Sequence, residues 1–238
     1  MIIQQILTIK FLTVRGHTIE GDGSGYDGGI YLNSRQNNTI KNCIIRNFNY
    51  GIYLYYSSNN TLTNNTANLN SIGIYLSSSS NNTLTNNTAN SNSYDGISLF
   101  SSSNNFLTNN TANLNGRNGI YLEYSSNNFL TNNTANLNKY YGIYLDSPSN
   151  NTLTNNTANS NSIGIYLYYS SNNTLTNNTA NSNYYGIYLD SSSNNTLTNN
   201  TANNNSDGCF YGWGSADNSI IQNTFCFNFW RGAQRAQQ

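Results

Sequence analysis

The sequence Gly51-Ile52-Tyr53-Leu54, followed by Asn-Asn-Thr-Leu-Thr-Asn-Asn-Thr-Ala-Asn over residues 59–68, decides the fold because near-copies of it return along most of the chain. Each copy opens with a glycine that lies 22 or 23 residues after the previous one: Gly29, Gly51, Gly73, Gly96, Gly119, Gly142, Gly164, Gly186 and Gly208. A fixed period of this length is typical of a solenoid, in which each copy buries its apolar face against the next copy.

Each copy is predicted to form one coil of three short strands. Alternation places the Ile and Leu of Gly-Ile-Tyr-Leu on one face and the Tyr on the other, and it places the Leu of Thr-Leu-Thr inside. A third strand buries Ala67, and in some copies we expect a further apolar residue to point inward: Leu69, Leu114 and Leu137. The connections lack the apolar spacing of a crossover helix. The chain is therefore predicted to be an all-β, right-handed parallel β-helix of about nine coils.

Asparagine is the most frequent residue, and its place in the repeat predicts a structural role. Asn tolerates the left-handed conformation of a tight corner. Corner Asn side chains from successive coils are expected to form amide ladders, in which every buried polar group is paired. The repeated Asn-Asn-Thr also matches the acceptor pattern for N-glycosylation. We expect Asn59 to lie at an accessible turn, and Asn64 and Asn86 to be held in the ladder.

The domain organisation follows from the limits of the repeat. Residues 1–28 are predicted to form an N-terminal opening coil and cap, and residues 29–207 the β-helix repeats. Residues 208–230 are predicted to form the last coil and an aromatic C-terminal cap, followed by a disordered tail at 231–238. Bulky residues replace small ones in that cap: Phe210, Tyr211, Trp213, Phe225, Phe227, Phe229 and Trp230.

Composition excludes several classes of function. Charged residues make up only 8% of the chain, which carries no net charge, so the basic surface of a nucleic-acid-binding protein is lacking. No apolar stretch approaches the ~20 residues that a membrane helix needs. Residues 1–12 show no signal-peptide layout. Three cysteines give neither a metal motif nor a disulfide framework, although Cys209 and Cys226 fall within one turn of the solenoid.

An outward column of tyrosines is the first candidate binding surface. It comprises Tyr31, Tyr53, Tyr75, Ser98, Tyr121, Tyr144, Tyr166 and Tyr188, so Ser98 interrupts it. Aromatic rings with hydroxyl tips suit sugars, which present an apolar face and hydrogen-bonding groups together. A contiguous exposed aromatic strip also tends to mark a binding surface. The alternative is that the tyrosines only stack on one another and stabilise the sheet.

A neighbouring outward column holds the candidate catalytic residues, Glu123 and Asp146, together with Asp190. Glu123 and Asp146 belong to adjacent coils, so we expect their carboxylates on the order of 5 Å apart. That separation is typical of the two carboxylates of a retaining glycosidase. Arg117 and Lys139 precede these strands and are expected to offset the repulsion. The alternatives are solvated surface charge or weak Ca²⁺ binding through oxygen ligands.

A second outward face carries a regular Thr-x-Thr array: Thr61 and Thr63, Thr83 and Thr85, Thr152 and Thr154, Thr174 and Thr176, Thr196 and Thr198. The array is similar to the flat surface of β-solenoid ice-binding proteins. Thr is also a common outward residue of strands, which favours a purely structural role. Phe106 and Phe129 replace the first Thr in two middle copies.

These repeats resemble the NosD-type β-helix family, also described as carbohydrate-binding and sugar-hydrolase β-helix domains. The segment from Gly16 to Gly25 is similar to the one that opens many such domains. The resemblance implies a right-handed parallel β-helix at an archaeal or bacterial cell surface or outside the cell, in contact with carbohydrate. The namesake's role in copper delivery is not expected here, because the chain has one His (His17) and one Met (Met1).

The residues and the resemblance together predict a non-catalytic surface or carbohydrate-binding protein without a cofactor. Its partner is expected to be a polysaccharide or glycan surface, bound by a monomer or by chains associated end to end or side by side. Sugars are expected along the tyrosine column and its acidic neighbour: Tyr53, Tyr75, Tyr121, Tyr144, Tyr166, Tyr188 and Asp190. The alternatives are a polysaccharide hydrolase or lyase that uses Glu123 and Asp146, and a structural or ice-binding solenoid.

Overall fold

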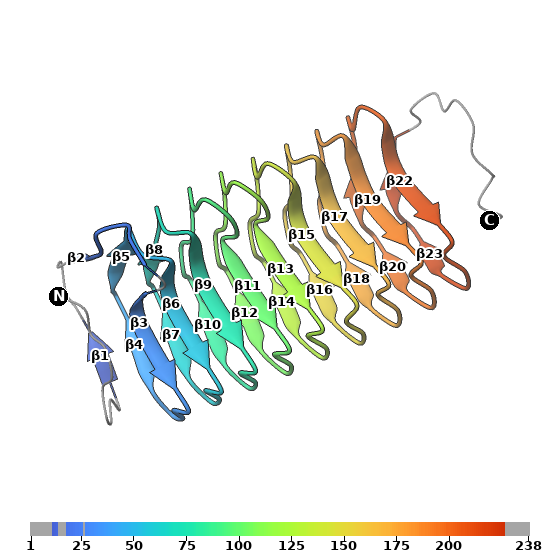
Figure 1. Cartoon of the computed structure of the whole chain (residues 1–238). Coiled ribbons are helices and arrows are strands. Elements are labelled where there is room, and N and C mark those ends of the chain that lie inside the picture. Colours follow the sequence, from blue (N-terminus) through green and yellow to red (C-terminus); the bar gives the residue numbers. More distant parts are fainter. Residues whose placement is uncertain (1–10, 14–17, 26, 227–238) are drawn as a thin grey trace.

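The computed structural model describes residues 11–13, 18–25 and 27–226, and in it the chain winds into a rod of stacked coils (Figure 1). All of its strand pairings are parallel, and each strand pairs with the equivalent strand one coil away, as in the pairing of Tyr144 with Tyr166. The predicted parallel β-helix is therefore confirmed, with coils of 22 or 23 residues and no helix in the described residues.

Two long sheets run the length of the rod. The sheet that carries the tyrosines, called the tyrosine sheet, has nine strands: β3 (Gly28–Asn33), β6 (Tyr50–Tyr55), β9 (Ile72–Ser77), β11 (Ile97–Phe100), β13 (Ile120–Glu123), β15 (Tyr141–Asp146), β17 (Ile163–Tyr168), β19 (Tyr185–Asp190) and β22 (Gly208–Trp213). The threonine sheet has ten: β1 (Phe11–Thr13), β4 (Thr39–Lys41), β7 (Thr61–Thr63), β10 (Thr83–Thr85), β12 (Phe106–Thr108), β14 (Phe129–Thr131), β16 (Thr152–Thr154), β18 (Thr174–Thr176), β20 (Thr196–Thr198) and β23 (Ser219–Ile221).

The third side of the coil is narrower. Its strands are β2 (Thr18–Glu20), β5 (Ile44–Arg46) and β8 (Thr66–Ala67) near one end and β21 (Thr201–Ala202) and β24 (Thr224–Phe225) near the other. Single parallel bridges, from Thr66↔Thr88 to Thr179↔Thr201, continue this side between them. The third predicted strand is thus reduced to one bridging residue in the middle coils.

Apolar residues from all three sides fill the interior. In one coil, Ile143 and Leu145 of β15, Leu153 of β16 and Ala158 are all 0% exposed. Burying the Ile and Leu side chains contributes roughly 1.5–3 kcal/mol each. The alternation of the repeat predicted this core correctly, and its repetition coil by coil produces a continuous column of apolar side chains.

The leucines after the third strand do not join that core, so the prediction for them was wrong. Leu69, Leu114 and Leu137 are 54%, 56% and 55% exposed. Each has a positive φ, 57° at Leu69, because the chain turns there. The turn directs the leucine outward and the following Asn70 inward, where it is buried.

Three ladders of buried asparagines hold the corners together. One runs through Asn65, Asn87, Asn110, Asn133, Asn156, Asn178 and Asn200, and the others contain Asn60 and Asn70. In each step of the Asn65 ladder the side-chain oxygen of one Asn accepts bonds from the backbone and side chain of its equivalent in the preceding coil, and in the other two ladders the backbone bond recurs. The amide ladder is confirmed. Asn64 and Asn86 lie outside it, contrary to the prediction, because both have positive φ and are exposed at the turn.

The last coil is shifted by one residue from the predicted alignment. Gly208 pairs with Tyr185, and Phe210 pairs with Ile187, so Cys209 rather than Gly208 follows the column of opening glycines. Cys209 forms a disulfide with Cys226, 17 residues later, which corrects the reading of the cysteines as having no disulfide. Cys43 occupies a corner, as predicted, and its backbone N–H donates to Asn65 Oδ1 at 3.1 Å.

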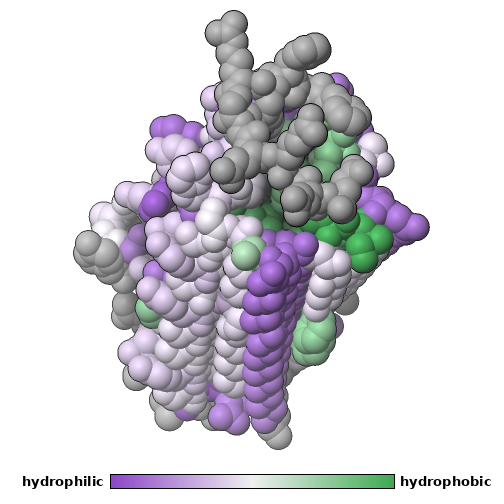
Figure 2. Space-filling model, turned by 90° about the vertical axis from the view of Figure 1, so that its right-hand side faces the viewer, coloured by the Kyte–Doolittle hydropathy of each residue, from purple (hydrophilic) through white to green (hydrophobic). Residues whose placement is uncertain are grey.

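Aromatic and aliphatic side chains gather at the C-terminal end of the rod (Figure 2). Phe210 and Phe225 stack with their ring centroids 5.2 Å apart and pack against the core. Ile220 and Ile221 are 40% and 47% exposed there. Phe227, Phe229 and Trp230 of the predicted cap, and the predicted tail at 231–238, lie outside the described residues.

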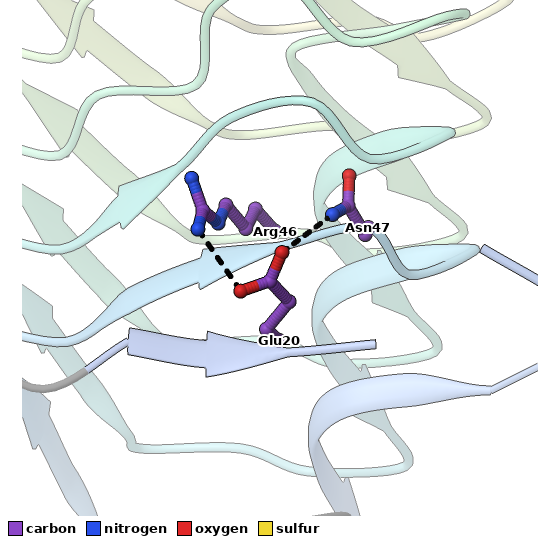
Figure 3. Close-up of polar contacts among 3 residues, drawn as sticks. All are labelled: Glu20, Arg46 and Asn47. Carbon is purple, nitrogen blue, oxygen red and sulfur yellow. Dashed lines mark hydrogen bonds and ion pairs between the residues drawn. The ribbon is translucent and has the colours of Figure 1, made fainter. Parts of the chain in front are cut away.

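At the other end, an ion pair joins β2 to β5. Arg46 Nη2 lies 2.9 Å from Glu20 Oε2, and Asn47 Nδ2 donates to Glu20 Oε1 at 3.0 Å (Figure 3). The side chains of Arg46 and Glu20 are about half exposed, so the pair contributes at most about 1 kcal/mol. The described part of the chain contains no helix long and apolar enough to cross a membrane.

Candidate functional site on the tyrosine face

Strand alternation places one column of tyrosines on the outer surface of the tyrosine sheet. In β15, for example, Ile143 and Leu145 are buried, whereas Tyr144 and Asp146 between and after them are partly exposed. Parallel register then aligns equivalent residues, pairing Tyr31 with Tyr53 and Tyr166 with Tyr188. We call this column, with the interruption at Ser98, the tyrosine ladder. Tyr211 extends it, because it pairs with Tyr188 once the last coil is correctly aligned.

The ladder rings stack on one another along the rod. The ring centroids of Tyr121 and Tyr144 are 5.0 Å apart and the rings are inclined by 7°, and Tyr144 and Tyr166 are 5.0 Å apart at 8°. Tyr31, Tyr53 and Tyr75 stack in the same way, with spacings of 5.1 Å. Within the ladder, ring faces are therefore covered by other rings. The surface that remains is a row of ring edges and hydroxyls, so the tyrosines do stack on one another, as one of the two predictions had it.

A second column of residues, which sequence reasoning missed, lies beside the ladder. Each member immediately precedes an opening glycine: Tyr50, Ile72, Asp95, Asn118, Tyr141, Ile163 and Tyr185. The tyrosines of this column pack against the ladder, with ring centroids 4.8 Å apart for Tyr50 and Tyr53. The signal that could have found them is the bulky residue before Gly in several copies.

The acidic column flanks the ladder on its other side. Register pairs Glu123 directly with Asp146, as predicted, whereas Tyr168 separates Asp146 from Asp190. Asp146 Oδ2 accepts a hydrogen bond from the Tyr144 hydroxyl at 3.2 Å and one from the Tyr121 hydroxyl at 3.5 Å. Asp190 is bonded in the same way by Tyr166, at 3.4 Å. The carboxylates therefore orient the ladder hydroxyls.

These surroundings keep the ladder hydroxyls protonated. Burial, followed by the nearby charges of Glu123 and Asp146, raises the pKa of Tyr121 far above its usual value. Burial and the Asp146 carboxylate do the same to the pKa of Tyr144. At Tyr53, burial and the neighbouring tyrosines raise the pKa to about 12. Each hydroxyl therefore stays protonated over the physiological pH range. Tyr121, Tyr144 and Tyr166 donate that proton to Asp146 or Asp190 and present the hydroxyl oxygen to a ligand as an acceptor.

The two cations predicted to offset the Glu123–Asp146 repulsion lie elsewhere. The Arg117 guanidinium lies over the ring of Tyr94, 5.9 Å from its centroid, and the Lys139 ammonium lies 5.4 Å from the centroid of Tyr140. Among the described residues, neither cation forms an ion pair with either carboxylate. Both cations lie over tyrosine rings of the turns before the strands, and their effect on the repulsion between the carboxylates stays a prediction.

The ladder is interrupted where small polar residues replace aromatic ones in two adjacent coils. Ser98 takes the place of a ladder tyrosine, and Asp95 and Asn118 take the places of the neighbouring column. All three are 4–5% exposed although they lie on the outer side of the sheet. Asp95 Oδ1 accepts from the Asn118 backbone N–H at 3.1 Å and from Asn118 Nδ2 at 2.9 Å. Burial raises the pKa of Asp95.

One polar atom at the interruption has no partner. Among the buried side-chain nitrogens and oxygens of the described residues, Asn118 Oδ1 alone makes no hydrogen bond. Its orientation is set by the carboxylate of Asp95, which accepts from the amide nitrogen on the other branch. An unpaired buried acceptor costs about 1–3 kcal/mol.

The threonine sheet presents a different surface. Its Thr-x-Thr pairs are aligned in register, as between Thr152 and Thr174, and equivalent residues form straight columns along the rod (Figure 2). Phe106 and Phe129 stack on this face with centroids 5.0 Å apart, which interrupts the threonine array. In the described residues, no group of three or more His, Cys, Asp or Glu side chains could hold a metal ion.

Comparison with known families decides the assignment of the chain. The model of a family described as "right handed beta helix region" matches residues 8–125 and 90–225. The chain belongs to this family. The match confirms both the predicted handedness and the predicted β-helix class, and it spans the tyrosine ladder from end to end. A search of curated proteins found no match to this β-helix.

Solved structures with the same fold include carbohydrate-active proteins. The β-helix matches the Azotobacter vinelandii mannuronan C-5 epimerase AlgE6 A-module with a TM-score of 0.80 and 20% identity, over 87% of this chain and 66% of that one. It matches the periplasmic alginate epimerase AlgG at 0.75 and 20%, over 79% and 50%. It matches DFA-IIIase from Arthrobacter chlorophenolicus A6 at 0.60 and 14%, over 87% and 61%. The chain thus spans half to two thirds of these structures, and the likeness shows a shared fold.

Proposed function

We propose that this β-helix is a non-catalytic surface protein that binds polysaccharide along the tyrosine face. The observation that carries the proposal is the in-register row of ladder hydroxyls, which are held by stacked rings and oriented by Asp146 and Asp190. Successive hydroxyls repeat at the strand spacing of ~4.8 Å, so an extended polymer lying along the rod meets the same group many times. The residues assigned to contact are Tyr53, Tyr75, Tyr121, Tyr144, Tyr166, Tyr188 and Asp190.

Two further points support this choice of partner. Rigidly held hydroxyls lose little conformational entropy when a ligand binds, which favours repeated weak contacts. The proteins of similar fold include two alginate epimerases and a DFA-IIIase in complex with GF2. A location outside the cytoplasm or at the cell surface is part of the proposal, in line with the periplasmic AlgG. The same proposal covers a monomer or chains joined end to end or side by side.

Removal of the ladder hydroxyls tests this proposal. The triple variant Tyr144→Phe, Tyr166→Phe and Tyr188→Phe keeps the stacked rings but deletes three hydroxyls that can hydrogen-bond to a ligand. We expect at least a tenfold loss of binding to the polysaccharide that the unaltered protein selects on a glycan array containing glucans, mannans and alginate. Three lost hydrogen bonds of about 0.5–1.5 kcal/mol each account for such a loss.

The matched control is Tyr169→Phe, which removes a hydroxyl from a tyrosine that is 59% exposed at a turn beside the ladder. This change should leave binding as it is. Equal binding by the triple variant and the unaltered protein would contradict the role of the ladder. If the unaltered protein retains no glycan on the array, the structural or ice-binding alternatives take its place.

A second candidate function is hydrolysis or elimination in a polysaccharide by Glu123 and Asp146. The observation that favours it is their direct pairing on adjacent strands, with the protonated Tyr121 hydroxyl close to both. Two carboxylates in this arrangement can divide the roles of acid and base or nucleophile.

Conservative amide substitutions separate catalysis from binding. If the pair is catalytic, Glu123→Gln and Asp146→Asn should each lower the release of reducing ends from the bound polysaccharide by at least a hundredfold while its retention stays the same. If the protein only binds, the unaltered chain releases no sugar, and that result removes the catalytic candidate.

A further inference from the structure

We infer that the interruption of the ladder at Ser98 is a subsite for one ring of a neutral sugar, held between Tyr75 and Tyr121. This inference rests on the proposed function and assigns it a particular place on the rod. Ser98 pairs with Tyr75 on one side and with Tyr121 on the other, so one coil without a ring separates the two aromatic rings.

The two tyrosines that border the interruption each have a ring neighbour on only one side. Tyr75 stacks on Tyr53 and on Tyr50, which belong to the preceding coil, and Tyr121 stacks on Tyr144 of the following coil, in each case away from Ser98. Among the described rings, none makes a ring contact with Tyr75 or Tyr121 from the side of Ser98. A ligand seated over Ser98 would stack on these two ring faces.

The spacing suits a single saturated ring. Two strand steps of ~4.8 Å place Tyr75 and Tyr121 roughly 10 Å apart along the rod. Van der Waals contacts of about 3.5–4.0 Å on each side leave room for the thickness of one puckered ring. A sugar ring has apolar C–H faces that pack on aromatic rings and hydroxyls at its edge.

Polar groups near Ser98 determine which chemical groups the edge of the sugar ring must carry. Asn118 Oδ1 is a buried acceptor without a partner, and the Asp95 carboxyl beside it is engaged by the Asn118 amide. A ligand hydroxyl that donates to Asn118 Oδ1 removes the cost of that unpaired acceptor. The unpaired acceptor therefore requires a ligand that donates a hydrogen bond, and the hydroxyls of a sugar are such donors.

The charges around the interruption favour an uncharged sugar over a uronate. Three carboxyl groups, those of Asp95, Glu123 and Asp146, lie on these strands and their adjoining turns, against the two cations of Arg117 and Lys139. A polyuronate would bring further negative charge to this surface and meet repulsion. The interruption is covered in this structure, since Ser98, Asp95 and Asn118 are only 4–5% exposed. A bound sugar must therefore displace the side chains that cover it.

The substitution Ser98→Tyr tests the inference without damaging the fold, because the ladder has tyrosine at the equivalent place in the coils on both sides. The new ring would complete the stack and occupy the subsite. Titration calorimetry with soluble neutral glucan and mannan should show binding to the neutral polymer weakened at least tenfold. The matched control Phe100→Tyr adds a hydroxyl to the same strand without filling the interruption, and it should bind as the unaltered protein does.

The side-chain amide resonance of Asn118 provides a second readout. It should shift when the neutral polymer is added to the unaltered protein and stay in place in Ser98→Tyr. Binding that is unchanged or tighter in Ser98→Tyr overturns the subsite, and if the phenylalanine triple variant is also weakened, the ladder proposal survives alone. Tighter binding of alginate than of neutral polymers overturns the assigned ligand class. Binding of none of these polymers removes both the subsite and the proposed function.

Discussion

Replacing Asn133 by leucine is expected to lower the free energy of unfolding by about 4 kcal/mol, because several buried hydrogen bonds are lost together. Asn133 Oδ1 accepts from the backbone N–H of Asn110 at 2.9 Å and from its side-chain nitrogen at 3.0 Å. Asn133 Nδ2 donates to Asn156 Oδ1 at 3.0 Å and to the Leu107 carbonyl at 2.8 Å. Leucine has a similar volume but satisfies none of these groups.

The neighbouring residue provides the control. Asn132 is exposed and has a φ of 55°, a conformation that glycine adopts readily. Asn132→Gly should therefore change the free energy of unfolding by less than about 0.5 kcal/mol. Urea unfolding followed by circular dichroism measures both variants. Equal stability of Asn133→Leu and the unaltered protein would show that the ladder does not hold the coils together.

Replacing Gly142 by alanine is expected to destabilise the rod by about 3 kcal/mol through overpacking. A Cβ atom at this position would lie 2.6 Å from the backbone oxygen of Gly164, 2.7 Å from Ala158 Cβ and 2.8 Å from Asn161 Nδ2. The first of these atoms belongs to the backbone, and the others are part of a short side chain and of an amide ladder. None can give way without moving a neighbouring coil.

Gly212→Ala is the matched control, since it makes the same change in a strand of the same sheet. A Cβ at Gly212 would meet only the ring of Phe210, at 3.9 Å, which is an ordinary contact. Because alanine restricts the unfolded chain more than glycine does, this substitution should raise the free energy of unfolding by about 0.4–1 kcal/mol. Thermal unfolding distinguishes the two variants by the sign of the shift, and a matching shift in both would contradict the packing argument.

Much of the fold could be predicted because every copy of the repeat shows the same alternation of apolar and polar residues. Ile143, Leu145 and Leu153 are buried where that alternation places them. The prediction failed where a turn, not an alternating strand, sets the direction of a side chain. Leu69 was assigned to the core on its residue type, but its positive φ directs it to solvent.

The alignment of the last coil failed for a related reason. Gly208 repeats the glycine spacing, yet Phe210 and not Cys209 pairs with Ile187. The position of the opening glycines requires a small residue, because a Cβ there would approach the next coil, as at Gly186. In the last coil Cys209 takes this position. Spacing alone could not distinguish two small residues next to each other.

The sequence predicted which residues of the candidate site lie next to each other on adjacent strands, but not which side chains contact each other. A period of 22 or 23 residues sufficed to pair Glu123 with Asp146. It left open whether the ladder rings stack on one another or present their faces to a ligand, because stacking depends on side-chain torsion angles. Asp95 and Asn118 were missed because the residue before the opening glycine lies at the end of a bend, where strand alternation does not define which way it points.

The asparagine ladders also determine how the length of this rod can change. Every rung donates to the next coil and accepts from the previous one, as Asn110 donates to Asn133 and Asn133 to Asn156. Inserting or removing one whole copy leaves each rung with an identical neighbour, whereas a partial copy breaks three ladders at once. The length of the rod therefore changes in steps of ~4.8 Å, one step for each copy. Gain or loss of a copy between Asp146 and Asp190 changes the distance between their carboxylates by ~4.8 Å, with the rest of the surface intact.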